Sequence, residues 1–415
     1  MARKMKDSGI EWIGEIPEGW EVVPVKRLCT MQAGKNLTSE QIAPEGTYPV
    51  YGGNGIRGFF SDYNCDGQFL TVGRQGALCG NVHKINGKVW ATEHAVITTP
   101  SSYTILDFLY YLLIGMDLNQ YVSSTAAQPG LAVGTLLNLK TCYPCSTLEQ
   151  TQISNYLNTK CSEIDVMLTK TRSSIEEYKK LKQAVITQAV TKGVRGEREM
   201  KDSGVDYIGQ IPAKWVLGKL RNVGDTQNGI SKSSEFFGKG FPFVSYSDVY
   251  KNYSLPFAVS GLVESTPEEQ ERYSVKEGDI FFTRTSETIE EVGFSCVCEK
   301  DIPNATFAGF LIRVRPFSDK LYTPYAKYYF RSSHLRFYLV KEMNLVTRAS
   351  LGQSLLKSMP VLLPPLEEQK EIADYLDTKC AEIDGLIAKK DQLVKELESY
   401  KKSLIYEVVT GKREV

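Results

Sequence analysis

The segment Glu149-Gln-Thr-Gln-Ile-Ser-Asn-Tyr-Leu-Asn-Thr-Lys-Cys-Ser-Glu-Ile-Asp165 returns 219 residues later as Glu368-Gln-Lys-Glu-Ile-Ala-Asp-Tyr-Leu-Asp-Thr-Lys-Cys-Ala-Glu-Ile-Asp384. Eleven of the 17 positions are identical, among them Tyr156/Tyr375 and Cys161/Cys380. A bias in composition does not place so many identities in one register. The chain therefore contains an internal duplication.

Each copy predicts one long helix, from Glu149 to about Thr191 and from Glu368 to about Thr410. Apolar residues recur at steps of mostly four and three, which is the spacing of a helix stripe that meets a partner helix. About 43 residues at ~1.5 Å each would make a rod of roughly 65 Å. Two unrelated surface helices would not share this register. We therefore expect the two copies to pack against each other as an antiparallel coiled coil that acts as a spacer.

A second repeat precedes each half of the chain. Met5–Trp20 and Met200–Trp215 agree at 10 of 16 positions and lie 195 residues apart. Because the helix copies are 219 residues apart, the segment between leader and helix is 24 residues longer in the second half. These inserts, 21–147 and 216–366, share no alignable identity, so a duplicated frame holds two different domains.

Both inserts are predicted to mix strands, helices and tight turns. The first insert predicts strands at 48–51, 69–72, 89–92 and 95–98 and a helix at 106–115. The second predicts strands at 241–245, 278–283, 294–298 and 309–314 and a helix at 325–338. The predicted fold class is α+β, with a pseudo-twofold duplication. The predicted order is leader and domain (1–147), spacer helix (148–199), leader and domain (200–365) and spacer helix (366–415).

Composition places few limits on function. The 415 residues suit two or three domains, and 49 basic residues balance 49 acidic ones. A chain without net charge does not cover nucleic acid as a polycation would, but it can still bind nucleic acid through local basic faces. The longest apolar stretch, 105–116, is too short to span a membrane. The absence of an apolar leader and the nine scattered cysteines predict a cytoplasmic protein.

Motifs for catalysis or cofactor binding are not found. Gly53-Asn-Gly-Ile-Arg-Gly58 spells a dinucleotide-binding pattern, but the turn-forming and aromatic residues after it predict a hairpin tip rather than the required helix. The lone pair Cys142 and Cys145, with three histidines in the chain, does not predict a zinc site. We expect no catalytic residue, no metal and no cofactor in this chain, although carboxylates alone could still catalyse.

The insert loops combine glycine with side chains that can bind DNA. Arginine pairs bidentately with guanine in the major groove, and asparagine or glutamine pairs with adenine. Comparable loops occur in both inserts, which suggests two DNA-reading domains. The candidate DNA-binding residues are Lys35, Asn36, Asn54, Arg57, Arg74, Gln75, Gln128, Ser231, Lys232, Arg284, Thr285, Arg348, Ser350 and Gln353.

The chain resembles the specificity subunits of type I restriction–modification systems over essentially its full length. The resemblance is carried by Leu148–Asn158 with Leu366–Asp377, by the two leaders, by Pro49–Gly55 and by Ala127–Leu131. One departure is Ser146-Thr-Leu-Glu-Gln150, where the second copy reads Pro364-Pro-Leu-Glu-Glu-Gln369. The first junction lacks the proline pair, which puts the entry into that helix in doubt.

The resemblance implies two target-recognition domains, each of which reads one half of an asymmetric, split site in double-stranded DNA. It implies that the paired helices set the unread gap and dock two methyltransferase subunits. Those subunits would bind S-adenosylmethionine and methylate adenine N6. The resemblance leaves open whether two motor-nuclease subunits, with their ATP and magnesium, also join. No membrane partner is implied.

The sequence leaves two alternatives open. The chain could be a coiled-coil scaffold whose inserts bind proteins and not DNA. It could also be a nuclease or methyltransferase in its own right, although no known catalytic motif supports this.

Overall fold

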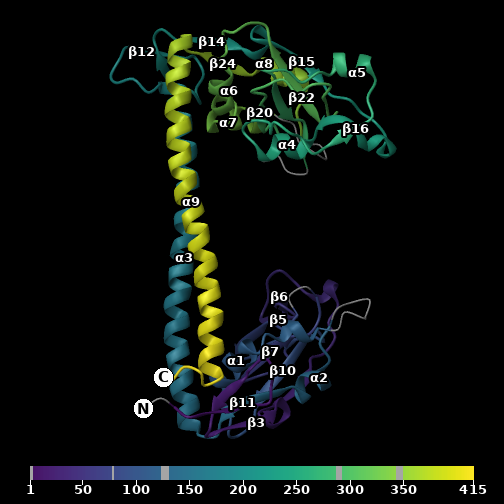
Figure 1. Ribbon diagram of the computed structural model, residues 1–415, viewed down its shortest axis with the longest axis vertical. Helices are drawn as coiled ribbons and strands as arrows, with labels where there is room; N and C mark the ends of the chain where they lie inside the picture. Colours follow the sequence, from purple (N-terminus) through teal and green to yellow (C-terminus); the bar gives the residue numbers. More distant parts are fainter. Residues whose placement is uncertain (1–2, 77–78, 123–129, 287–291, 343–348) are drawn as a thin grey trace. The chain divides into compact units, whose positions relative to one another are not determined.

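The computed structural model describes residues 3–76, 79–122, 130–286, 292–342 and 349–415 (Figure 1). The chain forms two compact units. The first unit comprises Met1–Arg172 with Asp391–Val415, and the second comprises Ser173–Lys390. Each unit contains one leader, one insert and part of each long helix.

The two predicted helices are confirmed as α3 (Thr147–Lys192) and α9 (Leu366–Val409). Their first residues are 219 positions apart, so the missing proline pair does not shift the helix start. In place of those prolines, the Ser146 hydroxyl accepts a hydrogen bond of 3.4 Å from the Glu149 amide, as a capping residue does.

Within each unit the two helices run antiparallel, as predicted. In the first unit, Lys401 bonds Asp165 at 2.6 Å and Arg172 bonds Glu398 at 2.5 Å. In the second unit, Lys182 bonds Asp384 at 2.6 Å, and the Lys390 ammonium lies 5.6 Å from the ring of Tyr178. Buried apolar residues form the seam between the helices, including Ile164, Leu168 and Leu404 in the first unit.

The first insert is built on a four-stranded antiparallel sheet with the order β4-β10-β7-β8. A smaller sheet places β5 between its hairpin partner β6 and the parallel strand β9, and β3 pairs with β11. The bounds are β3 (Trp20–Pro24), β4 (Cys29–Ala33), β5 (Tyr48–Gly52), β6 (Gly55–Phe60), β7 (Gln68–Gly73), β8 (Val82–Asn86), β9 (Trp90–Ala91), β10 (Ala95–Pro100), α1 (Leu106–Gly115), α2 (Val133–Asn138) and β11 (Lys140–Pro144).

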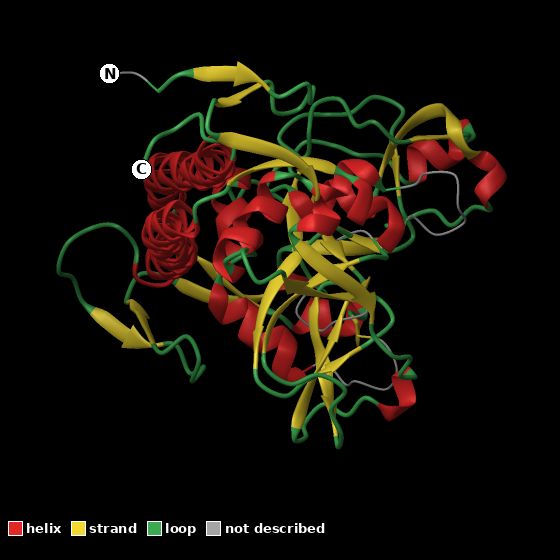
Figure 2. Cartoon of the chain, turned by 90° about the horizontal axis from the view of Figure 1, so that it is seen from below, coloured by secondary structure: helices red, strands yellow, loops and turns green. Residues whose placement is uncertain are grey.

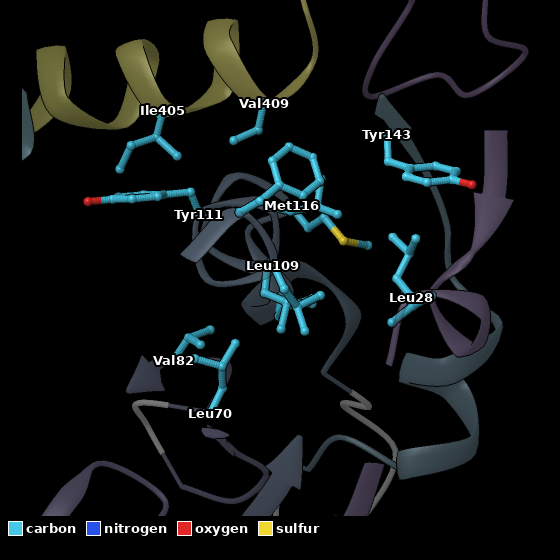
Figure 3. Close-up of a cluster of buried hydrophobic side chains, with 14 of the residues drawn as sticks. Leu28, Leu70, Val82, Leu109, Tyr111, Met116, Tyr143, Ile405 and Val409 are labelled. Atoms are coloured by element: carbon cyan, nitrogen blue, oxygen red, sulfur yellow. The ribbon is translucent and has the colours of Figure 1, made fainter. Parts of the chain in front are cut away.

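The core of the first unit joins this insert to the helices. Figure 3 shows Ile405 and Val409 of α9 facing Tyr111 and Met116, with Leu109 of α1 beneath them. All five side chains are buried. The hydrophobic effect therefore fastens the insert to the last turns of α9.

The second insert has the same topology, although its sequence cannot be aligned with the first. Its four-stranded antiparallel sheet has the order β15-β22-β18-β20, its small sheet again contains one parallel pair (β16 with β21), and β14 pairs with β24. Figure 2 shows that strands (yellow) and short helices (red) are mixed in the inserts. The bounds are β14 (Val216–Lys219), β15 (Gly224–Asn228), β16 (Phe237–Val244), α4 (Tyr246–Lys251), β17 (Leu262–Val263), α5 (Pro267–Arg272), β18 (Ile280–Thr283), β19 (Thr285–Ser286), β20 (Ser295–Val297), β21 (Thr306–Phe307), β22 (Leu311–Pro316), α6 (Thr323–Tyr329), α7 (Ser333–Glu342), β23 (Ala349–Ser350), α8 (Gln353–Ser358) and β24 (Pro360–Leu363).

One predicted helix is broken in two. The pattern predicted a single helix over 325–338, but α6 ends at Tyr329 and α7 begins at Ser333. Between them, the guanidinium of Arg331 donates to the backbone carbonyls of Ser295 (2.6 Å) and Asn252 (2.6 Å). These tertiary bonds hold the chain out of helical register, which a local pattern does not reveal.

The hairpin predicted at Gly53–Gly58 is confirmed, but its second strand starts earlier than expected. Gly52 pairs with Gly55, so Gly53 and Asn54 form a two-residue turn and β6 begins at Gly55. Gly55 has φ +94°, a conformation that suits glycine. A strand therefore stands where a dinucleotide site would need a helix.

Each leader forms a two-stranded hairpin and ends on a buried tryptophan. The hairpins are β1 (Met5–Asp7) with β2 (Glu15–Pro17), and β12 (Met200–Asp202) with β13 (Gln210–Pro212). The indole N–H of Trp20 donates to Glu149 at 3.0 Å, and that of Trp215 donates to Glu368 at 3.0 Å. Arg3 and Arg198 pair with the same two carboxylates. The leader is thereby bonded to the first turn of a long helix, where the helix dipole favours a negative charge.

The glutamine after each of these glutamates is also buried and fully bonded. Gln150 donates to the carbonyls of Tyr103 and Pro144 and accepts from the Ile105 amide at 2.8 Å. Gln369 makes the equivalent three bonds to Lys320, Pro364 and Tyr322. The identity of the repeated Glu-Gln pair thus has a structural cause in both units.

The two arginine–glutamate pairs differ in burial. Removal of the arginine is therefore expected to destabilise the two helix starts by different amounts. The side chain of Glu368 is 3% exposed, whereas that of Glu149 is 28% exposed. We expect Arg198→Met to destabilise the start of α9 by about 3 kcal/mol or more, because a buried carboxylate loses its cation. Arg3→Met should cost about 1 kcal/mol at the start of α3, where water screens the pair. Hydrogen exchange of the two helix starts measures both, and equal costs would contradict the explanation from burial.

A buried histidine predicts acid sensitivity of the second unit. Neither ring nitrogen of His334 has a hydrogen-bond partner among the described residues, and burial lowers its pKa to about 4. An unfolded chain takes up that proton near pH 6.5, so the contribution to stability is complete above pH 6.5 and falls as the pH drops toward 4. The loss at pH 5 should be about 2 kcal/mol.

In the variant His334→Leu, the unfolding free energy of the second unit should depend less on pH between pH 7 and pH 5. Chemical denaturation followed by hydrogen exchange measures this, with the half-buried histidine variant His94→Gln of the first unit as the control. An unchanged slope in His334→Leu would show that another group causes the acid sensitivity.

Candidate nucleic-acid interface

An arginine follows the same central strand in both inserts. The Arg74 amide donates to the His94 carbonyl at 3.0 Å, and the Arg74 carbonyl accepts from the Leu131 amide at 2.8 Å. In the second insert, the Arg284 amide donates to the Phe310 carbonyl at 2.9 Å, and its carbonyl accepts from Leu351 at 2.7 Å. Arg74 and Arg284 therefore occupy equivalent backbone positions, which the sequence did not indicate.

Other backbone bonds extend this correspondence along the same edge of the sheet. The Lys35 amide donates to Ala91 at 3.0 Å, and the Ile230 amide makes the same bond to Phe307 at 2.8 Å. Asn36 is therefore equivalent to Ser231. Gln75 pairs with Gly130 as Thr285 pairs with Ser350.

We call the residues that gather at this edge of the sheet in the first and second inserts the first and second loop edges. Both are formed where β4 or β15 ends, where β7 or β18 ends and where β10 or β22 begins. The first loop edge consists of Lys35, Asn36, Asn54, Arg74, Gln75 and His94, and the second consists of Ser231, Arg284, Thr285, Phe310 and Ser350.

Close backbone packing holds each loop edge together, and glycine makes it possible. A Cβ on Gly34 would lie 2.2 Å from the Ala91 carbonyl oxygen, and one on Gly229 would lie 2.2 Å from that of Phe307. A Cβ on Gly73 would lie 1.8 Å from the Gly53 carbonyl oxygen, so the β5–β6 turn rests directly on the end of β7. This contact brings Asn54 to the first loop edge, where it accepts a bond of 2.5 Å from Asn81.

Several predicted DNA-binding side chains are available for a ligand. Lys35, Asn36, Arg57 and Ser231 are exposed. The side chains of Lys35, Arg57 and Arg284 make no hydrogen bond or ion pair with another described residue. The Nε of Arg74 also lacks a partner in the same part of the chain, although this atom is buried. Cations without an internal partner are suited to bind phosphate or a base edge. Contact of these residues with DNA stays a prediction.

Other predicted residues use their side chains within the protein. The Lys232 ammonium bonds the Glu269 carboxylate and the Glu264 carbonyl, each at 2.7 Å. Gln353 accepts from Thr226 at 2.7 Å and donates to Asn228 at 3.0 Å, which fastens α8 to β15. Two further predicted residues, Gln128 and Arg348, lie outside the described residues.

Two members of the loop edges were missed by reasoning from the sequence. His94 and Phe310 take the same backbone position, but neither lies in a motif or a glycine-rich run that distinguishes it. His94 Nε2 lies 3.0 Å from the Glu93 carboxylate, whereas the Phe310 ring is exposed. The backbone bonds to Arg74 and Arg284 show that the two residues correspond.

The described residues contain no group of three or more His, Cys, Asp or Glu side chains arranged to hold a metal ion. None of the helices in that part of the chain is both long enough and apolar enough to cross a bilayer.

A family model, the type I restriction modification DNA specificity domain, matches the chain twice, over residues 17–177 and 212–396. The chain belongs to this family. Both matches start at equivalent leader prolines, 195 residues apart, and end at equivalent positions of α3 and α9, 219 residues apart. Each match thus spans the end of a leader, one insert and the larger part of a long helix. The prediction of a specificity subunit with two recognition domains is confirmed, and so is its α+β fold.

Relatives of the chain carry the same designation. The specificity subunit of the type I restriction enzyme MjaVIII of Methanocaldococcus jannaschii is 25% identical over 418 residues, which cover 96% of this chain and 93% of the relative. That of EcoprrI of Escherichia coli is 45% identical over 121 residues, or 28% of this chain and 30% of the relative. By this family membership, the chain is a DNA-recognition subunit rather than a catalytic one.

Solved structures support the fold. A chain from a structural study of complex assembly and conformational transition of the type I R-M system superposes with a TM-score of 0.71 at 16% identity, over 96% of this chain and 99% of that one. The HsdS subunit from Thermoanaerobacter tengcongensis gives a TM-score of 0.50 at 17% identity, over 96% and 98% of the two chains.

Proposed function

We propose that each loop edge reads one half of an asymmetric, bipartite site in double-stranded DNA. One observation carries this proposal: the two inserts place an arginine at the same backbone position and surround it with different side chains. Asn36 and Gln75 accompany Arg74, while Ser231 and Thr285 accompany Arg284. A shared frame with unlike reading groups suits two different half-sites.

Base recognition at these edges would follow the hydrogen-bonding pattern of the major groove. An arginine pairs with the O6 and N7 acceptors of guanine, and a glutamine or asparagine pairs with adenine, each good pair discriminating by about 1–3 kcal/mol. Lysines such as Lys35 would contact phosphates, which position the protein without reading sequence. The chain as a whole is neutral, so the cationic contacts would be local to the edges and shared with partner subunits.

We further propose that α3 and α9 set the unread gap and dock two methyltransferase subunits. Apolar side chains on these helices remain exposed, among them Val166 (50%), Met167 (52%) and Leu393 (43%) in the first unit and Leu181 (48%) and Leu386 (42%) in the second. Apolar surface on a helix face supports docking of another protein. The methyltransferases would bring S-adenosylmethionine and flip the target adenine out of the stack to reach N6. Motor-nuclease subunits, with their ATP and magnesium, would join through them.

Removal of each arginine tests half-site reading. In a complex with its methyltransferase subunits, Arg74→Ala should relax one base position of one half-site by about 1–3 kcal/mol, because a guanine contact is lost. Arg284→Ala should do the same in the other half-site only. Methylation of DNA substrates varied one base pair at a time measures both effects.

Two matched variants serve as controls. Arg27→Ala and Arg221→Ala each remove an exposed cation from the same two inserts, before β4 and β15 begin, and should leave base preference unchanged. A loss that is uniform over all sequences would reassign the arginines to phosphate contacts. If neither variant changes either half-site, half-site reading by the loop edges is wrong.

Lengthening both helices tests their role as the spacer. Seven residues inserted after Arg172 in α3 and after Lys390 in α9 keep the pairing register within each unit and add about 10 Å of helix. At about 3.4 Å per base pair, the unread gap should grow by about three base pairs while both half-sites stay the same. Methylation mapping of genomic DNA measures the gap. A seven-residue insertion in α3 alone, which breaks the register, should lower activity, and an unchanged gap in the double insertion would exclude the spacer role.

A further inference from the structure

Phe310 is an aromatic residue whose backbone is held while its side chain stays in solvent. Its carbonyl accepts from the Arg284 amide at 2.9 Å, and its neighbour Gly309 donates to the Ile230 carbonyl at 2.8 Å. The residue is nevertheless 65% exposed. Among the described residues, it belongs to none of the buried clusters and stacks on no other ring.

The surrounding turn directs this side chain outward. Ala308 and Leu311 on either side are 7% and 0% exposed, and the Leu311 amide closes the turn on Ala308 at 2.9 Å. A Cβ on Gly309 would lie 2.3 Å from the Ser231 hydroxyl, so the turn lies directly on the second loop edge. The backbone of Phe310 therefore lies beside Arg284 and one residue from the contact with Ser231, while its phenyl ring is exposed.

The first loop edge has a polar residue at this position. His94 makes the equivalent bond to Arg74, and its ring lies against the Glu93 carboxylate at 3.0 Å. The two edges thus share the arginine and differ beside it, with an imidazole in one and a phenyl ring in the other. A difference of this kind would distinguish two half-sites by an apolar contact.

We propose that Phe310 is a specificity-determining residue that contacts the C5-methyl group of a thymine in the second half-site. This inference rests on the proposed function, in which Arg284 reads a base of that half-site. The thymine methyl is the apolar feature of the major groove, and a phenyl ring is one of the side chains that contacts it. Burial of both apolar groups removes them from water, which favours thymine over a base without the methyl.

The neighbouring residues favour DNA over a protein partner as the occupant. The described residues that share the second loop edge with Phe310, namely Ser231, Arg284 and Thr285, are polar. Protein docking surfaces normally present a larger contiguous apolar patch. An exposed ring at the same edge as a cation that has no partner among the described residues is better matched to a base edge next to phosphates.

Uracil substitution isolates the proposed contact, because it removes only the methyl group. In the complex with its methyltransferase subunits, each thymine of the second half-site is replaced in turn by deoxyuridine. The wild-type complex should methylate one of these substrates about 3- to 5-fold more slowly, the effect of one buried methyl group. Phe310→Ala should be slow on the thymine substrate and indifferent to the replacement. Phe310→Leu should retain part of the discrimination.

The matched control is His94→Ala, which should leave the response to uracil in the second half-site unchanged. A second half-site that contains no thymine, or a wild-type complex that is indifferent to every replacement, would overturn the inference. So would a Phe310→Ala variant that keeps the discrimination, or one that instead assembles poorly with the methyltransferase in native mass spectrometry.

If Arg284→Ala alters the second half-site while Phe310→Ala does not, the role of Phe310 alone is wrong. If Arg74→Ala and Arg284→Ala both leave their half-sites unaltered, the proposed function itself is wrong.

Discussion

In each unit, a glutamate in the first turn of a long helix joins that helix to the leader of the same unit. Glu149 and Glu368 each accept an indole N–H from the leader tryptophan and pair with a leader arginine. The next residue, Gln150 or Gln369, bonds the loop that enters α1 or α6. Leader, insert and helix thus meet at one polar cluster in each unit. Glu368 is buried and Glu149 is partly buried, and charges removed from water are tolerated only when they are paired and bonded. This cluster therefore restricts the sequence strongly, and it is the part that repeats.

The inserts show the opposite relation between sequence and structure. Their sequences share no alignable identity, yet both fold into the same four-stranded sheet order and the same parallel pairing beside it. A β-sheet requires an alternation of apolar residues and a few glycines at close contacts rather than particular side chains. Gly34 and Gly229 are such positions, since each faces a carbonyl oxygen at a distance that excludes a Cβ. The frame therefore tolerates extensive change at its loop edges, where recognition would differ.

Charge is used locally in a chain that is neutral overall. Many lysines and arginines are paired within the protein, as Lys401 is with Asp165 and Lys182 with Asp384 in the helix pairs. Lys35, Arg57 and Arg284 have no such partner among the described residues. A net charge of zero therefore gives no information about whether a surface can bind a polyanion, because what matters is which cations remain unpaired.

The repeated register was sufficient to show the duplication, and local sequence patterns were sufficient for both long helices and for eight strands of the inserts, because those elements depend on spacing within a short segment. The tertiary structure alone revealed the common topology of the inserts and the equivalence of Arg74 with Arg284. It also revealed the break between α6 and α7, and that the side chains of Lys232 and Gln353 are bonded within the protein. All of these rest on hydrogen bonds between residues far apart in the chain, such as Arg284 with Phe310 and Leu351. No local periodicity records such bonds, since they form only when separate strands meet at one edge of a sheet.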